Sequence, residues 1–184
     1  MFALVTVTHG YCVTKIVRTC DLRASECANK FGNMLKKKKI QYSIVKFLTS
    51  RLDVDANRKM PIGDEGIKLW TIFNNKIKDK ISINKNKKIL LFDIHSFPKG
   101  EFDNSQITII DLKDSYRKEL KMFTNYISSK YGINIKLYNG AEDNYVQETY
   151  KDRTYPILIE FCEDKDYLLD CHIIKFFEEL INYF

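Results

Sequence analysis

The stretch KKILLFDIHSFPKG, residues 87–100, decides the fold class of this chain. Its apolar residues follow one another without alternation, which is typical of a strand buried on both faces of a sheet. The strand predicted over Lys88–Ile94 ends in Asp93, His95 and Ser96. Asp93 and His95 lie two positions apart on an extended chain, so their side chains would point to the same side. Either these residues simply cap the strand, or they deliver a ligand to a functional site.

Similar patterns extend in both directions from this strand. Apolar residues recur at helical spacing in four segments, and five further short segments are typical of strands. We expect helices at residues 22–37, 64–79, 114–131 and 171–183, and further strands at 2–8, 40–48, 106–112, 133–138 and 156–161. Alternating strands and helices predict an α/β layered fold with a largely parallel central sheet, in a single domain over residues 1–184.

Composition limits the class of protein. The hydrophobic share of 45% is enough for a core of normal size. The N-terminal FALVTV is too short to span a membrane and lacks a basic leader, so we interpret it as the first strand. The five cysteines are an odd number without a C-x-x-C pair, which favours a reduced, cytoplasmic protein without zinc-finger spacing.

The positive charge raises the question of a nucleic-acid partner. The net charge is +6, and Lys36–Lys39 form a basic run. These lysines lie where a helix is predicted to end, a position that favours cations, and no aromatic residues interleave with them. The pattern therefore disfavours nucleic acid as the main partner.

Four predicted strands end in, or are followed by, residues that could do chemistry, namely His9, Asn57-Arg58, His95 and Glu160. In open α/β sheets, ligands bind beyond the carboxyl ends of the strands. Two imidazoles and a carboxylate with an open fourth position are the usual ligands of a hydrolytic zinc ion. A separate carboxylate can then transfer the water proton, and an arginine can hold a substrate carboxylate.

The ordered motifs THG…CDLRASECA, DANR, FDIHSFP and ILIEF resemble the N-formylglutamate amidohydrolase family. This family lies within the zinc-carboxypeptidase-like hydrolases, together with the aspartoacylases. The resemblance implies a three-layer α/β/α fold with a mixed, largely parallel central sheet. It also implies one zinc ion held by His9, Asp21 and His95, with Glu160 as general base and acid.

The same resemblance implies how a substrate would bind. The Asn57-Arg58 pair matches residues that hold a substrate carboxylate, and Asn144 is a further candidate contact unless it caps a helix. We therefore expect a zinc-dependent hydrolase that cleaves an amide bond of an N-acylated acidic amino acid or of another small carboxylate-bearing substrate. One alternative is a zinc peptidase acting on peptidoglycan-like or γ-glutamyl peptides. The other is a non-catalytic binding protein on the same scaffold.

Two residues compete with Asp21 for the acidic ligand position. The wider carboxypeptidase group often has glutamate three residues after the first histidine, where this chain has Cys12. A Cys12 thiolate or the Glu26 carboxylate would be alternative ligands. We favour Asp21, because a carboxylate completes the usual catalytic set and its position before a helix could aim it at the metal.

Supporting roles remain open at three positions. Asp93 could orient His95 as a hydrogen-bond partner or could bond only to the turn. Arg18 or Arg23, on either side of Asp21, could stabilise an oxyanion, and surface pairing is the alternative.

Overall fold

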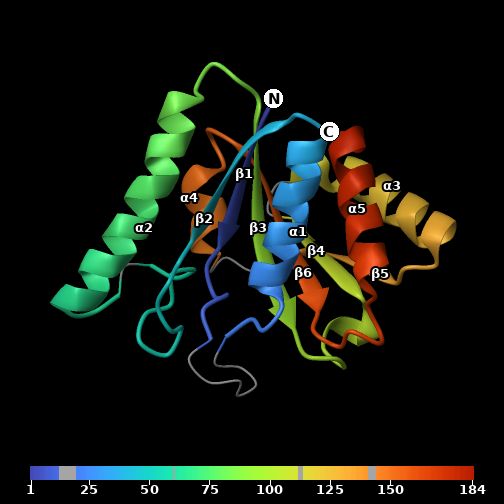
Figure 1. Cartoon of the computed structure of the whole chain (residues 1–184), viewed down its shortest axis with the longest axis horizontal. Helices are drawn as coiled ribbons and strands as arrows, with labels where there is room; N and C mark the ends of the chain where they lie inside the picture. The colour runs from blue at the N-terminus through green and yellow to red at the C-terminus, as the bar shows by residue number, and fades with distance from the viewer. Residues whose placement is uncertain (13–19, 60, 112–113, 141–143) are drawn as a thin grey trace.

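A six-stranded mixed sheet forms the centre of the molecule (Figure 1). The computed structural model describes residues 1–12, 20–59, 61–111, 114–140 and 144–184. The strands lie in the order β2-β1-β3-β6-β4-β5, and only β4 and β6 pair antiparallel. The strands are β1 (Phe2–Val7), β2 (Gln41–Lys46), β3 (Ile89–Phe97), β4 (Ile107–Asp111), β5 (Ile135–Asn139) and β6 (Tyr155–Cys162).

Helices cover both faces of this sheet. In Figure 1, α2 and α4 lie on one side of the strands and α1, α3 and α5 on the other. Their bounds are α1 (Ala24–Lys37), α2 (Asp64–Ile83), α3 (Asp114–Tyr131), α4 (Tyr145–Tyr150) and α5 (Asp170–Tyr183). The predicted α/β fold with a mixed, largely parallel sheet is confirmed. The sequence patterns missed α4, because its six residues are too few to show a helical period.

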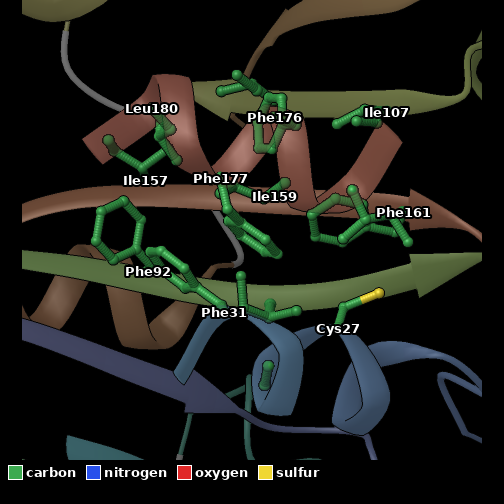
Figure 2. Packing of buried hydrophobic residues seen from close by; sticks show 14 of the residues in the cluster. Cys27, Phe31, Phe92, Ile107, Ile157, Ile159, Phe161, Phe176, Phe177 and Leu180 are labelled. Carbon is green, nitrogen blue, oxygen red and sulfur yellow. The ribbon is translucent and has the colours of Figure 1, made fainter. Parts of the chain in front are cut away.

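The larger hydrophobic core lies between the sheet and helices α1, α3 and α5. Figure 2 shows Phe31 of α1 packed between Phe92 of β3 and Phe177 of α5. Its ring stacks on Phe177 with centroids 4.1 Å apart and meets Phe92 edge-on at 4.9 Å. This packing fixes α1 against the sheet, and the chain that enters α1 carries Asp21.

A smaller core lies on the opposite face, under α2 and α4, and strand alternation connects it to the polar residues. Leu4 of β1 and Leu91 of β3 point into this core. Because side chains alternate along a strand, Thr6, Asp93 and His95 face the same side, nearer the carboxyl ends. The sheet therefore delivers its polar side chains to the face covered by α2 and α4.

Strand β3 extends further than the sequence pattern predicts. It continues to Phe97, so His95 lies within the strand rather than after its end. The reason is pairing with β6, where His95 is in register with Glu160 and Phe97 with Cys162. Two predicted functional residues are therefore direct neighbours in the sheet.

The expectation that all cysteines are reduced is wrong. Cys12 and Cys20 form a disulfide, with Cα atoms 5.4 Å apart. Cys27, Cys162 and Cys171 are free thiols. The odd number of cysteines suggested that none is bonded, but one pair close in sequence can form a disulfide while the other three remain free.

Within the described parts of the chain, no helix is both long enough and apolar enough to cross a membrane. The basic run is placed as expected: Lys36 and Lys37 form the last turn of α1, where their charges complement the helix dipole.

Candidate metal centre and its cavity

His9, Asp21 and His95 come together at the carboxyl ends of β1 and β3. One ligand atom from each lies within 4.8 Å of the others, and all three residues are buried. The two imidazoles face the same carboxylate oxygen: Asp21 Oδ2 lies 2.8 Å from His95 Nδ1 and 3.6 Å from His9 Nδ1. The structure thus gathers the three predicted ligands into one cluster.

A second carboxylate contacts the other nitrogen, Nε2, of each imidazole. His9 Nε2 lies 2.6 Å from Asp55 Oδ1, and His95 Nε2 lies 3.1 Å from Asp93 Oδ2. Thr6 in turn donates a hydrogen bond of 2.7 Å to Asp93 Oδ1. Asp93 therefore contacts the imidazole, which settles the question left open by the sequence. These contacts leave both Nδ1 atoms directed towards Asp21.

The donor set fits a divalent cation. Among the described residues, no group hydrogen-bonds to His9 Nδ1, although this atom is buried. A buried polar atom normally has a hydrogen-bond partner or binds a metal. A divalent cation would fill this role for His9 Nδ1. Histidine ligands of metals usually bond through their other nitrogen to a carboxylate, as His9 does with Asp55 and His95 with Asp93.

Backbone contacts fix the loop that carries His9 and Asp21. The Asp21 amide donates a 3.0 Å hydrogen bond to the His9 carbonyl. Gly10 packs so closely on α1 that a Cβ there would lie 2.4 Å from Ser25 Oγ. Glycine at this position therefore allows the chain after β1 to pass the start of α1 and turn His9 towards Asp21.

Two side chains, Ser96 of β3 and Glu163 directly after β6, anchor the start of α1. Ser96 Oγ accepts a 3.0 Å hydrogen bond from the Arg23 amide, and Glu163 Oε1 accepts one of 2.7 Å from the Leu22 amide. Ser96 also donates to Glu163 at 2.9 Å. Because these bonds satisfy free amides at the helix entrance, they hold Asp21 in place without a side-chain cap from the helix itself.

The charges in the cluster support one another. Burial by itself would raise the pKa of the Asp21 carboxyl, but its contacts with His9 and His95 outweigh burial and lower that pKa. Burial likewise would lower the pKa of His95, yet Asp93 and Asp21 raise it well above its ordinary value. These shifts favour a protonated His95 beside an ionised Asp21. A metal ion bound by His95 would displace this proton.

A cavity of about 660 Å³ opens beside the cluster. The residues that line it include His9, Asp21 and His95 together with Glu160, Asn57, Arg58 and Asn144. All seven residues singled out in the sequence therefore lie around one space. The sequence patterns gave no measure of this space, because residues from at least seven separate segments form its walls.

Glu160 lines the cavity and lies on β6 in register with His95 of β3. Burial raises the pKa of its carboxyl to about 7, with Asp21 and Asp93 adding to the rise and the two histidines opposing it. A carboxyl that titrates near neutral pH is suited to proton transfer.

Basic residues lie on the β2 side of the cavity. Arg58 is half exposed and lies 4.0 Å from Asp55, while Arg51 donates a 3.4 Å hydrogen bond from Nε to Asp55. Burial would raise the pKa of Asp55, but His9, the Asn57 amide and Arg51 outweigh it and lower that pKa to about 2. Asp55 thus links the basic wall to the imidazole of His9.

The two asparagines differ in their surroundings. Asn57 Oδ1 accepts a 3.4 Å hydrogen bond from the Val146 amide, so this side chain supports the start of α4. Asn144 precedes α4 but makes no capping bond with its side chain. Its Oδ1 is buried and has no hydrogen-bond partner in the described chain, and the residue lines the cavity. Helix capping therefore does not account for Asn144.

The alternative ligands of the sequence analysis lie elsewhere. Cys12 is bonded to Cys20, which removes its thiolate, and Glu26 pairs with Lys30 and Lys165. Both proposals for replacing Asp21 are therefore wrong for this structure.

The arginine predictions are settled in part. Arg18 lies outside the described residues. Arg23 is buried on the other side of α1, where it donates to the Cys162 and Leu168 carbonyls and pairs with Asp170 at 2.6 Å. It does not line the cavity, so its role is in the fold rather than at an oxyanion.

Sequence reasoning gave no role to Asp55 or Arg51. Asp55 stands two residues before Asn57, and its Oδ1 accepts a 3.0 Å bond from the Asn57 amide. That short-range turn was the available signal, since an aspartate commonly bonds to the amide two residues ahead. Nothing local predicted its second bond, to His9 at 46 positions' distance.

Comparison with known proteins supports the fold. No family model matches the sequence, and no curated protein matches it. A gene product of Agrobacterium tumefaciens matches at 16% identity and a TM-score of 0.71, over 98% of this chain and 88% of that one. The catalytic domain of an N-acetylmuramoyl-L-alanine amidase from Bacillus (Paenibacillus) polymyxa matches at 13% identity and a TM-score of 0.56, over 99% of this chain and 97% of that one.

Murine aminoacylase 3 is a further structural neighbour, at 14% identity and a TM-score of 0.52, over 99% of this chain and 65% of that chain. At these identities the similarity establishes a shared fold. Membership of the amidohydrolase family that the motifs resemble stays a prediction.

Proposed function

We propose that this protein is a metal-dependent hydrolase that cleaves an amide bond in an N-acylated acidic amino acid or another small substrate with a carboxylate. The observation that carries the proposal is the buried cluster of His9, Asp21 and His95, in which His9 Nδ1 has no hydrogen-bond partner among the described residues. A shared fold with an amidase and an aminoacylase supports it.

His9, Asp21 and His95 would hold the ion, and zinc is the natural occupant of two imidazoles and a carboxylate. A zinc ion in such a set polarises a carbonyl and lowers the pKa of a water to about 7. Asp55 and Asp93 hold the two imidazoles in the orientation that directs Nδ1 to the ion. These carboxylates also make the imidazoles stronger ligands.

Glu160 would move the proton. Its carboxylate lies in the same cavity and would accept a proton from the attacking water, then donate it to the nitrogen of the leaving amine. Its pKa of about 7 suits both steps. Arg58 would hold the substrate carboxylate, Asn57 would keep α4 in position beside it, and Asn144 Oδ1 would accept a hydrogen bond from the substrate.

Metal analysis of the purified protein tests the first part. We expect one divalent ion per chain in the wild type and its loss in His9→Ala. His172→Ala is the matched control, because His172 lies on α5 outside the cavity, and it should retain the ion. A wild type without a divalent ion, or equal metal content in His9→Ala, would refute the metal site.

The Glu160→Gln variant tests the second part. It should keep the metal and lose amide hydrolysis by roughly 10²- to 10⁴-fold, the usual contribution of a general base. Glu178→Gln, on the surface of α5, should behave as wild type. Full activity of Glu160→Gln would show that another group transfers the proton.

A further inference from the structure

A left-handed turn stands at the rim of the cavity. Phe102, Asp103 and Asn104 have φ angles of 48°, 53° and 55°. Three consecutive residues without glycine in this region are costly, and a bulky residue such as phenylalanine is a clear outlier. Such conformations persist where the surrounding structure enforces them, and they gather at ligand-binding sites.

Side chains from β5 and its approach enforce the turn. Tyr138 Oη donates a 2.8 Å hydrogen bond to Asp103 Oδ2, and Asn134 Nδ2 donates one of 3.0 Å to the Asn104 carbonyl. The Phe102 ring meets Phe97 edge-on at 5.0 Å and Tyr138 at 5.6 Å. The turn therefore holds the Phe102 ring in one place.

That place is a wall of the cavity. Phe97, Pro98 and Phe102 line the cavity, and Phe102 contacts Tyr138 of β5. Arg58 also lines it and lies in the loop that follows β2, whereas β1, β3 and β6, which carry or precede His9, His95 and Glu160, come between β2 and β5 in the order of the sheet. From this order we infer that a substrate whose carboxylate is held by Arg58 extends its other end towards Phe102.

The size of the cavity indicates what that other end is. A volume of about 660 Å³ lies within the range of about 300–1,000 Å³ that encloses ligands of drug size. Two carboxylates, Glu101 and Glu163, also line the cavity. Glu163 Oε1 already accepts bonds from the Leu22 amide and Ser96, so this oxygen serves the start of α1.

We propose that Phe97, Pro98 and Phe102 form a subsite for an apolar acyl group larger than formyl, with Phe102 as the residue that selects it. The substrate class is then an acidic amino acid acylated by an aliphatic chain or an aromatic ring. This inference rests on the proposed function, because it takes Arg58 as the residue that binds the substrate carboxylate.

Binding measurements test the subsite separately from hydrolysis. Calorimetry on the Glu160→Gln protein, as purified, would compare N-formyl-, N-acetyl- and N-benzoyl-L-glutamate. Burying the ring should make the benzoyl compound bind roughly 10- to 100-fold more tightly than the formyl compound. Adding Phe102→Ala should remove most of this preference for the benzoyl compound over the formyl compound. Tyr126→Ala, on the exposed face of α3, is the matched control.

A second variant tests the turn without changing the cavity lining. Tyr138→Phe removes only the hydroxyl that bonds Asp103. In the otherwise wild-type enzyme it should raise KM for the benzoyl substrate severalfold, with kcat and the formyl KM unchanged. A merely structural role would lower the activity on both substrates together.

The outcomes separate the two proposals. Hydrolysis with equal affinity for all three compounds would overturn the acyl subsite and keep the proposed function. Graded affinity without hydrolysis by the wild type would do the reverse. Tighter binding of glycyl-L-glutamate than of the benzoyl compound would also overturn the subsite, because an ammonium group would then be the preferred end.

Discussion

At the scale of single residues, the decisive feature is that each imidazole of the candidate metal centre lies between two carboxylates. Asp21 contacts both rings through one oxygen, while Asp55 and Asp93 each bond to the far nitrogen of one ring. The spacing Asp93-x-His95 on a strand places the second pair on one side by geometry alone. The unusual polar end of β3 is thus a histidine together with the carboxylate that orients it.

Removing this carboxylate should weaken the metal site. In Asp93→Asn, His95 Nε2 loses its charged partner, so we expect metal affinity to fall by roughly 10- to 100-fold, as for other such partners of ligating histidines. Competition with a chromophoric chelator would measure it. Asp166→Asn, at an exposed position, is the control. Unchanged affinity in Asp93→Asn would mean that Thr8, whose Oγ1 lies 3.2 Å from the same nitrogen, is enough.

At the scale of elements, the entrance of α1 joins the site to the core. Arg23 is only 2% exposed and donates to the carbonyls of Cys162 and Leu168. It fixes α1 to the end of β6 and to the chain before α5. The backbone amide of Arg23 thus bonds to Ser96 beside Asp21, while its buried guanidinium ties the start of α1 to the core.

Arg23→Ala should destabilise the protein by about 3 kcal/mol, because it leaves two buried carbonyls without donors and removes packing. Urea unfolding would measure the change. Arg153→Ala, at an exposed position after α4, should change stability by less than about 0.5 kcal/mol. A loss as small as that in Arg23→Ala would show that water or neighbouring groups satisfy these carbonyls.

Asp170, the ionic partner of Arg23, gives the fold a dependence on pH. Burial would raise the pKa of its carboxyl, but bonds to Lys30 and Arg23 outweigh it and lower that pKa below 3.8. A carboxyl with a lower pKa in the folded state adds stability above its unfolded pKa and loses it as pH falls through the folded value.

Wild-type stability should therefore fall in acid. Asp170→Asn should be less stable than wild type near neutral pH. This difference should disappear at a pH low enough to protonate the Asp170 carboxyl in both the folded and the unfolded state. Urea unfolding of both proteins near pH 7 and near pH 2 would test this. An equal difference at both pH values would contradict the electrostatic explanation.

At the scale of the whole molecule, sheet order decides which segments meet. β3 lies between β1 and β6, so His9, His95 and Glu160 come from adjacent strands although up to 151 positions separate them. The loop after β2 and the turn before β4 both contribute to the cavity beside this centre, the first with Arg51 and Arg58 and the second with Phe102.

The Cys12–Cys20 disulfide closes a loop between His9 and Asp21, across a separation of 8 residues. Replacing both cysteines by serine should destabilise the protein by about 2–3 kcal/mol through the loop entropy of the unfolded chain. It should also lower metal affinity, since Cys20 directly precedes Asp21. Thermal unfolding and chelator competition measure the two effects, with Cys171→Ser, an exposed free thiol, as control. If both properties stay unchanged, the bridge does not help to position Asp21.

The sequence by itself determined the fold class and the residue types of the site. Apolar runs and helical periods are local properties, so they predicted the strands and the four longer helices, and positions at or after strand ends singled out His9, Asn57-Arg58, His95 and Glu160. Asp21 and Asn144 came from the family resemblance, and the cavity is lined by all seven residues.

Only the tertiary structure decided which partners these residues have. The bond of Asp55 to His9, the bridge between Cys12 and Cys20, and the meeting of Phe102 and Arg58 in one cavity all depend on how strands and loops distant in sequence pack together. No local period encodes such contacts, because they arise from sheet order and loop closure. The physical reason is that secondary structure follows from neighbours along the chain, whereas a site follows from neighbours in space.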